Sequence, residues 1–306
     1  MRKFFKNFFE FSLLIILLGT IYYYRENINT FVLTHFYTVN KDVKLTYKNE
    51  YFRDYNYKYV KITDDFLAKD KKQLIDIYYT IINSGIENFS FYCSNSYKSC
   101  ITDVVEIANN QETLSNINSF VHPYNSFNSI ETKYDTLGKI TLKINKSYTK
   151  DQIQKINTVI AKIMKDEIKD EKDEKLIIKK IHDYIINNSK YDKEKSNKQI
   201  DKYASSIAYG PLIEGYGLCG GYTDAMTLFL DYYKIPNFKV ISENHIWNAV
   251  YIDNEWYHLD LTWDDPVTSD GSDVLEYNFF LITTKELEEL ETNQHVFDKD
   301  VFEEVK

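Results

Sequence analysis

The sequence predicts an α+β fold in which a cysteine-bearing helix packs on an antiparallel sheet, preceded by a smaller α/β region and an apolar N-terminal segment. Three observations lead to this prediction. Apolar residues recur at helical spacing in several stretches, and strand-like stretches alternate with them. Five of the nine glycines and all three tryptophans gather in residues 210–263. We therefore divide the chain into segments 1–24, 25–146 and 147–306.

Composition limits the class of partner. A chain of 306 residues has room for two modest domains, and its 43% hydrophobic content supports a real core. The net charge of −9, without a basic stripe beyond the first residues, argues against a nucleic-acid partner. No Cys-x-x-Cys or paired-histidine spacing is present, so we expect neither a metal nor a cofactor.

The first segment, 1–24, has the pattern of a membrane anchor or a signal. Arg2, Lys3 and Lys6 precede an uncharged run of fourteen residues, Phe11–Tyr24. This run is short for a membrane span of roughly 17–25 residues, but flanking aromatic residues can extend it. Because a basic flank stays in the cytoplasm, we expect a single-pass cell-membrane protein whose bulk lies outside. A cleaved signal peptide is the alternative, and it would make the protein secreted.

The second segment, 25–146, carries local patterns but no chemical motif. Lys69–Asn83 is amphipathic and predicts a helix, and Phe89–Cys93 is strand-like. Ile130–Tyr134 and Lys139–Ile144 flank Asp135–Gly138, which is typical of a hairpin turn. The role of this region stays open.

Two of the three cysteines lie in this second segment. Cys93 and Cys100 bound a polar loop, so they are candidates for a small disulfide. Such a bond persists only in an oxidising compartment. Two unpaired thiols are the alternative. Either way, Cys219 is left over, as a nucleophile must be.

The third segment opens with a helix signal. Thr149 and Gln152 form a capping box ahead of a periodic apolar stripe, and a second helix is expected at about Glu174–Asn187. A third helix follows Cys219 and ends before Pro236. Three strands are expected after it, at Phe238–Ser242, Ile246–Ile252 and Trp256–Trp263.

Cys219 lies where a glycine-rich loop becomes the third helix. The first turn of a helix has unsatisfied N–H groups and a positive dipole end, which favour thiolate over thiol. Gly220 and Gly221 have no side chains, so a substrate backbone could approach the sulfur closely. This placement indicates a reactive cysteine rather than an inert core residue.

Strand geometry brings a histidine and an aspartate together. If Asp253-Asn254 is a two-residue hairpin turn, Trp247 lies opposite Asp260 and His245 is the diagonal neighbour of Asp260 on the same face. Diagonal neighbours are roughly 7–8 Å apart, within reach of an imidazole and a carboxylate. Asp260 could then hold the tautomer of His245 that faces Cys219.

Other polar residues of this region have simpler interpretations. His258 shares the face of His245 and is expected to be a structural neighbour. Asp264 and Asp265, before Pro266, are expected to form a turn.

In these motifs the chain resembles the transglutaminase-like superfamily, whose members have a papain-like cysteine-enzyme core. The resemblance covers about residues 150–266. The matching pieces are Ile181–Tyr184 with Tyr191-Asp192, Tyr216–Tyr222, His245–Asn248 and Trp256–Trp263.

The resemblance implies that Cys219 is the nucleophile, His245 the base and Asp260 the group that orients the base. It also implies acyl transfer on peptide or glutamine-type amides through a thioester, ending in hydrolysis or cross-linking. A protein or peptide of the cell envelope is the expected partner.

Further candidates and alternatives remain open. Tyr209, Gly220, Gly221 and Trp247 are candidates for the oxyanion hole or substrate contacts. A catalytically silent surface domain could bind peptide or cell-wall material through the same cleft. An α/β-hydrolase elbow at Gly217–Gly221, with Cys219, Asp260 and His295 as its triad, is a further alternative.

Overall fold

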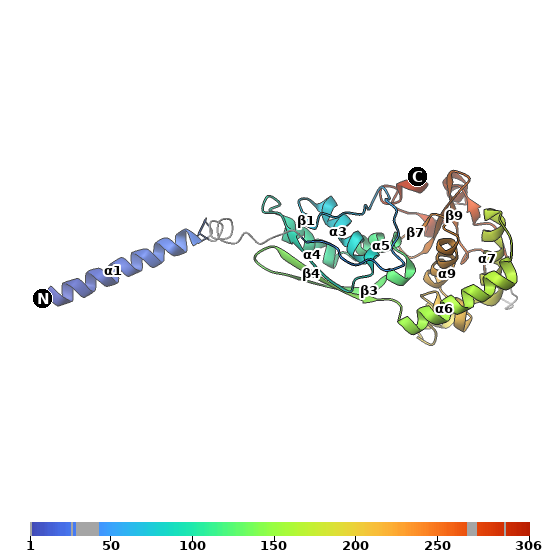
Figure 1. Cartoon of the computed structure of the whole chain (residues 1–306), viewed down its shortest axis with the longest axis horizontal. Helices are drawn as coiled ribbons and strands as arrows, with labels where there is room; N and C mark the ends of the chain where they lie inside the picture. The colour runs from blue at the N-terminus through green and yellow to red at the C-terminus, as the bar shows by residue number, and fades with distance from the viewer. Residues whose placement is uncertain (1, 26, 29–42, 268–273, 291) are drawn as a thin grey trace.

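The computed structural model describes residues 2–25, 27–28, 43–267, 274–290 and 292–306, so part of the predicted region 25–146 lies outside it. Figure 1 shows the arrangement of its elements. The helices are α1 Arg2–Tyr23, α3 Lys71–Ser84, α4 Cys100–Asn109, α5 Gln111–Ser119, α6 Lys150–Ile163, α7 Glu174–Asn188, α8 Lys193–Lys198, α9 Cys219–Tyr232 and α10 Thr284–Glu289. The strands are β1 Leu67–Ala68, β2 Asn88–Cys93, β3 Phe127–Tyr134, β4 Lys139–Lys146, β5 Lys190–Tyr191, β6 Tyr216–Gly217, β7 Asn237–Ile241, β8 Ile246–Ile252, β9 Glu255–Leu259 and β10 Phe280–Ile282.

The N-terminal segment is helical, but it does not support the expected membrane anchor. α1 carries exposed apolar side chains such as Leu14, Ile15 and Leu18. Within the described ranges, however, no helix combines the length and the apolar character that crossing a membrane requires. The uncharged run Phe11–Tyr24 holds fourteen residues, fewer than the roughly 17–25 of a span. The prediction of a membrane anchor at 1–24 is therefore not supported.

The N-terminal region folds around a four-stranded sheet of order β1-β2-β4-β3. β3 and β4 form the predicted hairpin, and Gly138 in its turn has φ 77°, a left-handed conformation that favours glycine. The predicted helix at 69–83 is α3, capped by the side chain of Asp70. The sequence patterns did not indicate α4 and α5, which lie beside α3.

A disulfide joins Cys93, at the end of β2, to Cys100, the first residue of α4. Both half-cystines are buried in the core of this region. The bond therefore ties the start of α4 to the end of β2.

The helices of the C-terminal half follow the predicted pattern. α6 begins after the capping box of Thr149 and Gln152, and α7 begins after Asp173, whose side chain accepts from the backbone of Leu176. α9 starts at Cys219 and is buried along nearly its whole length, because it packs against β7, β8 and α7. These helix predictions are confirmed.

The C-terminal sheet has the order β10-β9-β8-β7 and is antiparallel throughout. Its β8–β9 hairpin turns at Asp253 and Asn254, with φ 51° and 65°, as a two-residue turn requires. Ala249 pairs with His258, which is the predicted register. The third strand ends at Leu259, earlier than predicted, so Asp260 lies just beyond it.

The two faces of this sheet belong to two hydrophobic clusters. Val250, Ile252 and Leu259 belong to the cluster that includes α6, α7 and α9. Phe238, Val240, Trp247 and Ala249 belong to the cluster that includes the N-terminal sheet. Hydrophobic side chains thus pack on both faces of the C-terminal sheet, and on one face they come partly from the N-terminal region.

The predicted domain boundary at residue 146 stays a prediction.

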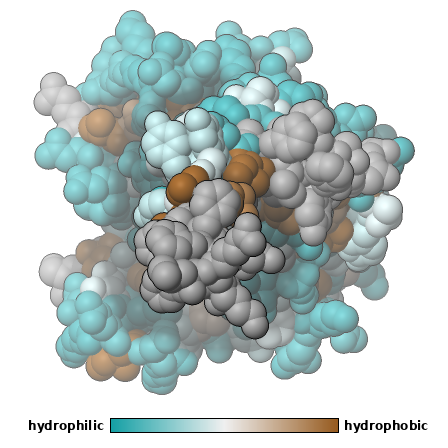
Figure 2. Space-filling model, turned by 90° about the vertical axis from the view of Figure 1, so that its left-hand side faces the viewer, coloured by the Kyte–Doolittle hydropathy of each residue, from teal (hydrophilic) through white to brown (hydrophobic). Residues whose placement is uncertain are grey.

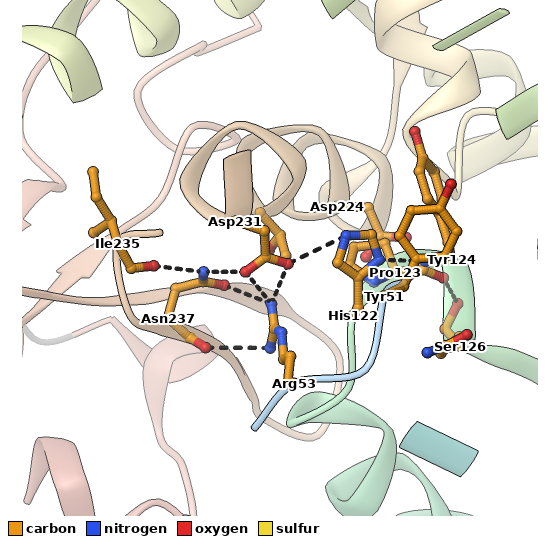
Figure 3. Close-up of polar contacts among 12 residues, drawn as sticks. Tyr51, Arg53, His122, Pro123, Tyr124, Ser126, Asp224, Asp231, Ile235 and Asn237 are labelled. Atoms are coloured by element: carbon orange, nitrogen blue, oxygen red, sulfur yellow. Dashed lines mark hydrogen bonds and ion pairs between the residues drawn. The ribbon is translucent and has the colours of Figure 1, made fainter. Parts of the chain in front are cut away.

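Arg53 joins the N-terminal region to the end of α9 (Figure 3). Its guanidinium donates to both carboxylate oxygens of Asp231 at 2.9 and 2.8 Å, and to the backbone and side-chain oxygens of Asn237. His122 Nε2 lies 3.5 Å from the same carboxylate. Burial lowers the pKa of His122 to about 4, although Asp231 opposes this effect, so His122 is neutral at pH 7.

The face that carries α1 is mostly hydrophilic, with hydrophobic residues in small separate groups (Figure 2). Apolar side chains are instead collected in the two clusters on either side of the C-terminal sheet.

Candidate active site

Cys219 is the first residue of α9 and the free cysteine of the chain. Leu218 before it is extended and no side chain caps the helix, so the first-turn N–H groups keep their positive potential at the sulfur. The thiol is half-buried, which leaves it reachable from outside. The structure therefore places Cys219 where the sequence predicted, at a loop-to-helix junction.

Gly220 and Gly221 are needed for a reason other than the one inferred from sequence. A Cβ at Gly221 would lie 2.2 Å from the backbone oxygen of Ser205, and one at Gly220 would lie 2.7 Å from that of Ser206. The protein's own loop, rather than a substrate backbone, occupies the space that these glycines leave. Their contact with substrate stays a prediction.

His245 and Asp260 lie at the open end of the β8–β9 hairpin, opposite its turn: His245 directly precedes β8 and Asp260 directly follows β9. His245 Nε2 lies 2.5 Å from Asp260 Oδ2, and both side chains are buried. The other carboxylate oxygen, Oδ1, accepts from the backbone N–H groups of Thr262 and Trp263 at 2.9 and 3.3 Å. Because an ionised carboxylate only accepts, Nε2 carries the hydrogen and Nδ1 is left for Cys219.

The pKa shifts of His245 and Asp260 agree with a hydrogen bond from Nε2 of His245 to the ionised carboxylate of Asp260. Burial by itself would lower the pKa of His245, but the charge and hydrogen bond of Asp260 and the hydrogen bond to Cys219 raise it well above its usual value. Burial would raise the pKa of Asp260, but the charge and hydrogen bond of His245 and the hydrogen bond of His295 lower it. The pair therefore favours an imidazolium beside a carboxylate, and the imidazolium can stabilise a thiolate at Cys219.

Trp247 is a core residue and not a surface for substrate. It is fully buried, its ring stacks on His245 with centroids 5.7 Å apart, and its Nε1 donates to His258 Nδ1 at 2.9 Å. The prediction that Trp247 contacts substrate is therefore wrong, because no part of it faces solvent. His258 is the structural neighbour that the sequence indicated.

Sequence reasoning missed the second histidine on Asp260. His295 Nε2 lies 2.9 Å from the same Oδ2 atom that His245 contacts. No pattern could have indicated this contact, since His295 follows Asp260 by thirty-five residues and ends a short 3-10 helix, Asn293–His295. The sequence singled out His295 only as the histidine of a hydrolase triad.

Asp264 and Asp265 do more than form a turn. Asp264 is fully buried, lies 3.1 Å from His182 Nε2, and accepts from the backbone of Phe279. Asp265 accepts a 2.5 Å hydrogen bond from Tyr222, in the first turns of α9. These contacts fix the chain after Asp260 to the helices, so the turn-former interpretation was incomplete.

Two further features concern the oxyanion hole and metal binding. Tyr209 is half-buried at the start of the helical turn Gly210–Glu214, and its role in an oxyanion hole stays a prediction. Nitrogen atoms of His245 and His295 and a carboxylate oxygen of Asp260 lie within 4.8 Å of one another, so these three residues could hold a metal ion. Their mutual hydrogen bonds account for the arrangement without one.

Residues 162–261 match the model of the transglutaminase-like superfamily. This segment belongs to the transglutaminase-like superfamily. The match includes all three residues Cys219, His245 and Asp260, and it stops before His295. Members of the superfamily are typically cysteine-dependent enzymes.

The chain is similar to several solved structures, of which two are described below, and no curated protein matches it. A structure described as a TGase is 14% identical over 59% of this chain and 64% of its own, with a TM-score of 0.34. A structure described as a candidate cysteine protease from Cytophaga hutchinsonii is 17% identical over 48% of this chain and 65% of its own, with a TM-score of 0.27. The chain thus spans less than two thirds of the length of either.

The transglutaminase-like assignment excludes the hydrolase alternative. A hydrolase elbow follows a strand of a mostly parallel sheet, whereas the sheet that bears Asp260 is antiparallel and Cys219 follows the two-residue strand β6. Cys219 is also among the groups that raise the pKa of His245, so the two side chains are neighbours. The interpretation of Cys219, Asp260 and His295 as a hydrolase triad is therefore wrong.

Proposed function

We propose that this protein is an extracytoplasmic cysteine enzyme that transfers acyl groups from peptide or glutamine-type amides through a thioester. One observation carries the proposal: Cys219 at the start of α9 lies close enough to His245 to raise the pKa of its imidazole, and Nε2 of His245 is held by the buried carboxylate of Asp260. A nucleophile beside a base, with the base held by an orienting group, is what covalent acyl transfer requires.

The reaction follows from these contacts. The Cys219 thiolate attacks the amide carbonyl carbon, and the imidazolium of His245 gives its Nδ1 proton to the departing amine, which leaves a thioester. Water or a second amine then attacks the thioester, with His245 accepting a proton, and the thiolate is restored. Asp260 stays ionised and keeps the ring in the tautomer that this cycle needs.

The Cys93–Cys100 disulfide supports the extracytoplasmic location. Such bonds persist in oxidising compartments and are rare where thiols are kept reduced. The bond also keeps two thiols away from the chemistry, so Cys219 is the free nucleophile.

Product analysis on the full chain tests the proposal. The protein is incubated with a library of glutamine-containing peptides, with and without a labelled primary amine, and products are identified by mass spectrometry. We expect a covalent acyl adduct on Cys219, and either cleaved or deamidated peptides or amine-labelled ones. The Cys219→Ala variant is the control and should form none of these.

The same experiment separates the alternative of a silent binding domain. Such a domain would bind peptides equally with Cys219 or alanine, would form no adduct, and would react with iodoacetamide no faster than an ordinary thiol. That outcome would contradict the proposal.

A further inference from the structure

We propose that His295 is a positioning residue that completes the Cys219–His245–Asp260 triad by fixing the carboxylate of Asp260. The inference rests on the proposed function and adds to it a residue that lies outside the segment shared with the transglutaminase-like superfamily.

The hydrogen bonds of His295 define its tautomer. Its Nε2 lies 2.9 Å from Asp260 Oδ2, and its Nδ1 lies 2.5 Å from Thr292 Oγ1. The carboxylate can only accept, so Nε2 carries the hydrogen and Nδ1 can accept from the hydroxyl of Thr292. His295 is thus a donor to Asp260 that is anchored at both ring nitrogens.

Aromatic side chains keep this ring in place and keep water away. His295 stacks on Phe279 with centroids 4.8 Å apart and an interplanar angle of 15°. The edges of Trp247 and Trp263 approach it at 4.8 and 5.0 Å. His295 is only 5% exposed and Asp260 only 2% exposed, so bulk water does not replace the hydrogen bond between them.

As a consequence, each carboxylate oxygen of Asp260 accepts two hydrogen bonds. Oδ1 accepts from the backbone of Thr262 and Trp263, and Oδ2 accepts from His245 and His295. Without His295, Oδ2 keeps one donor and faces a new cavity beside it. The carboxylate can then rotate away from His245, and the imidazole loses the orientation that pairs it with Cys219.

The alkylation of Cys219 by iodoacetamide measures this pairing without a substrate. The full chain with its disulfide intact has one reactive thiol, so the second-order rate can be followed between pH 4 and 10 by intact mass. In the wild type, the imidazolium of His245 should keep the rate high at acid pH. In His295→Ala, the midpoint of the profile should move upward by about one pH unit or more, because the thiolate loses a well-placed cation.

Two variants make the test specific. His295→Gln keeps an N–H donor near the position of Nε2 and should restore most of the wild-type profile. His258→Asn is the matched control, since His258 is a buried histidine of the same cluster that accepts from Trp247 and is not hydrogen-bonded to Asp260 in the structure. Its profile should match the wild type even if its unfolding midpoint falls.

The outcomes separate this inference from the proposed function. A wild type that forms no acyl adduct contradicts the proposed function, whereas the alkylation profile still reports on His295. If His295→Ala lowers the unfolding midpoint but leaves the profile unmoved, His295 is only structural and the inference is overturned. A stoichiometric metal in the purified protein that is lost in His295→Gln would also overturn it, because the three side chains would then be ligands.

Discussion

The N-terminal sheet β1-β2-β4-β3 and the C-terminal sheet β10-β9-β8-β7 each have four strands, but they bury different kinds of side chain. The first buries Phe91, Ile140 and Leu142 and is supported by a disulfide. The second buries Trp247 and His258. Just beyond the end of β9 it also buries Asp260 with its hydrogen-bond partners His245 and His295.

This difference shows that the C-terminal half retains buried ionisable groups at a cost in stability. Burying ionisable groups costs several kcal/mol unless they are paired and hydrogen-bonded. Four of the six histidines lie buried in the C-terminal half, and three of them contact a buried aspartate. A region that only needed to fold would gain more from apolar residues at these positions.

The largest effect should come from removing the base. In His245→Ala, hydrolysis of p-nitrophenyl acetate should fall to the level of Cys219→Ala, a loss on the order of 10⁶ in the protease precedent. His122→Gln is the control in the other region, because His122 is a buried neutral histidine on Asp231. Equal losses in both variants would mean that the two regions do not differ in function.

Removing the charge of Asp260 should come second. Asp260→Asn keeps the shape of the side chain but favours the wrong tautomer of His245, a cost on the order of 10⁴ in turnover in the serine-protease precedent. Turnover with the same ester measures it. A loss under tenfold would show that Asp260 does not orient the base.

The same variant gives a prediction for pH. The raised pKa of His245 stabilises the fold fully below about pH 6.5, and this contribution is lost as pH rises through about 10. The lowered pKa of Asp260 stabilises the fold fully above about pH 4, and this contribution is lost as pH falls toward 2. Urea unfolding should therefore show a larger stability difference between wild type and Asp260→Asn at pH 5 than at pH 10.

A fourth prediction separates structural from catalytic pairs within the C-terminal half. His182 and Asp264 are completely buried, and His182→Ala leaves the carboxylate oxygen without that partner. Unfolding in urea should show a loss of about 3–5 kcal/mol. The alkylation rate of Cys219 in the folded protein should stay within about twofold, since His182 does not contact the triad. A large fall in that rate would make this pair part of the site.

The smallest effect belongs to the N-terminal region. Replacing Cys93 and Cys100 together by alanine opens a short loop and should cost about 2–3 kcal/mol. Ester hydrolysis should not change, because the bond lies in the other sheet. A parallel loss of activity would show that the two regions are coupled through their shared core.

Local patterns in the sequence were sufficient for the helices and the hairpin of the C-terminal half. A capping box at Thr149, a loop-to-helix junction at Cys219 and a two-residue turn at Asp253 are each set by neighbours in the chain. The turn fixes the register, and the register places His245 beside Asp260. These features could be predicted because the interactions that determine them span few residues.

Contacts between distant segments could not be predicted in this way. His295 reaches Asp260 only because the chain after β10 folds back over the sheet, and Gly221 is required only because the loop at Ser205 crosses it. Neither contact leaves a periodic or spacing signal. The burial of Trp247 likewise depends on a core to which both halves contribute.

The sequence by itself determined that a helix begins at Cys219 and that His245 lies beside Asp260, because a loop-to-helix junction and a two-residue hairpin turn are set by neighbouring residues. Only the tertiary structure decided that a second histidine holds Asp260, and that the glycines beside Cys219 accommodate the protein's own loop. The physical reason is that hydrogen bonding and hydrophobic periodicity within an element are local, whereas the environment of a buried charge is made by every segment packed around it.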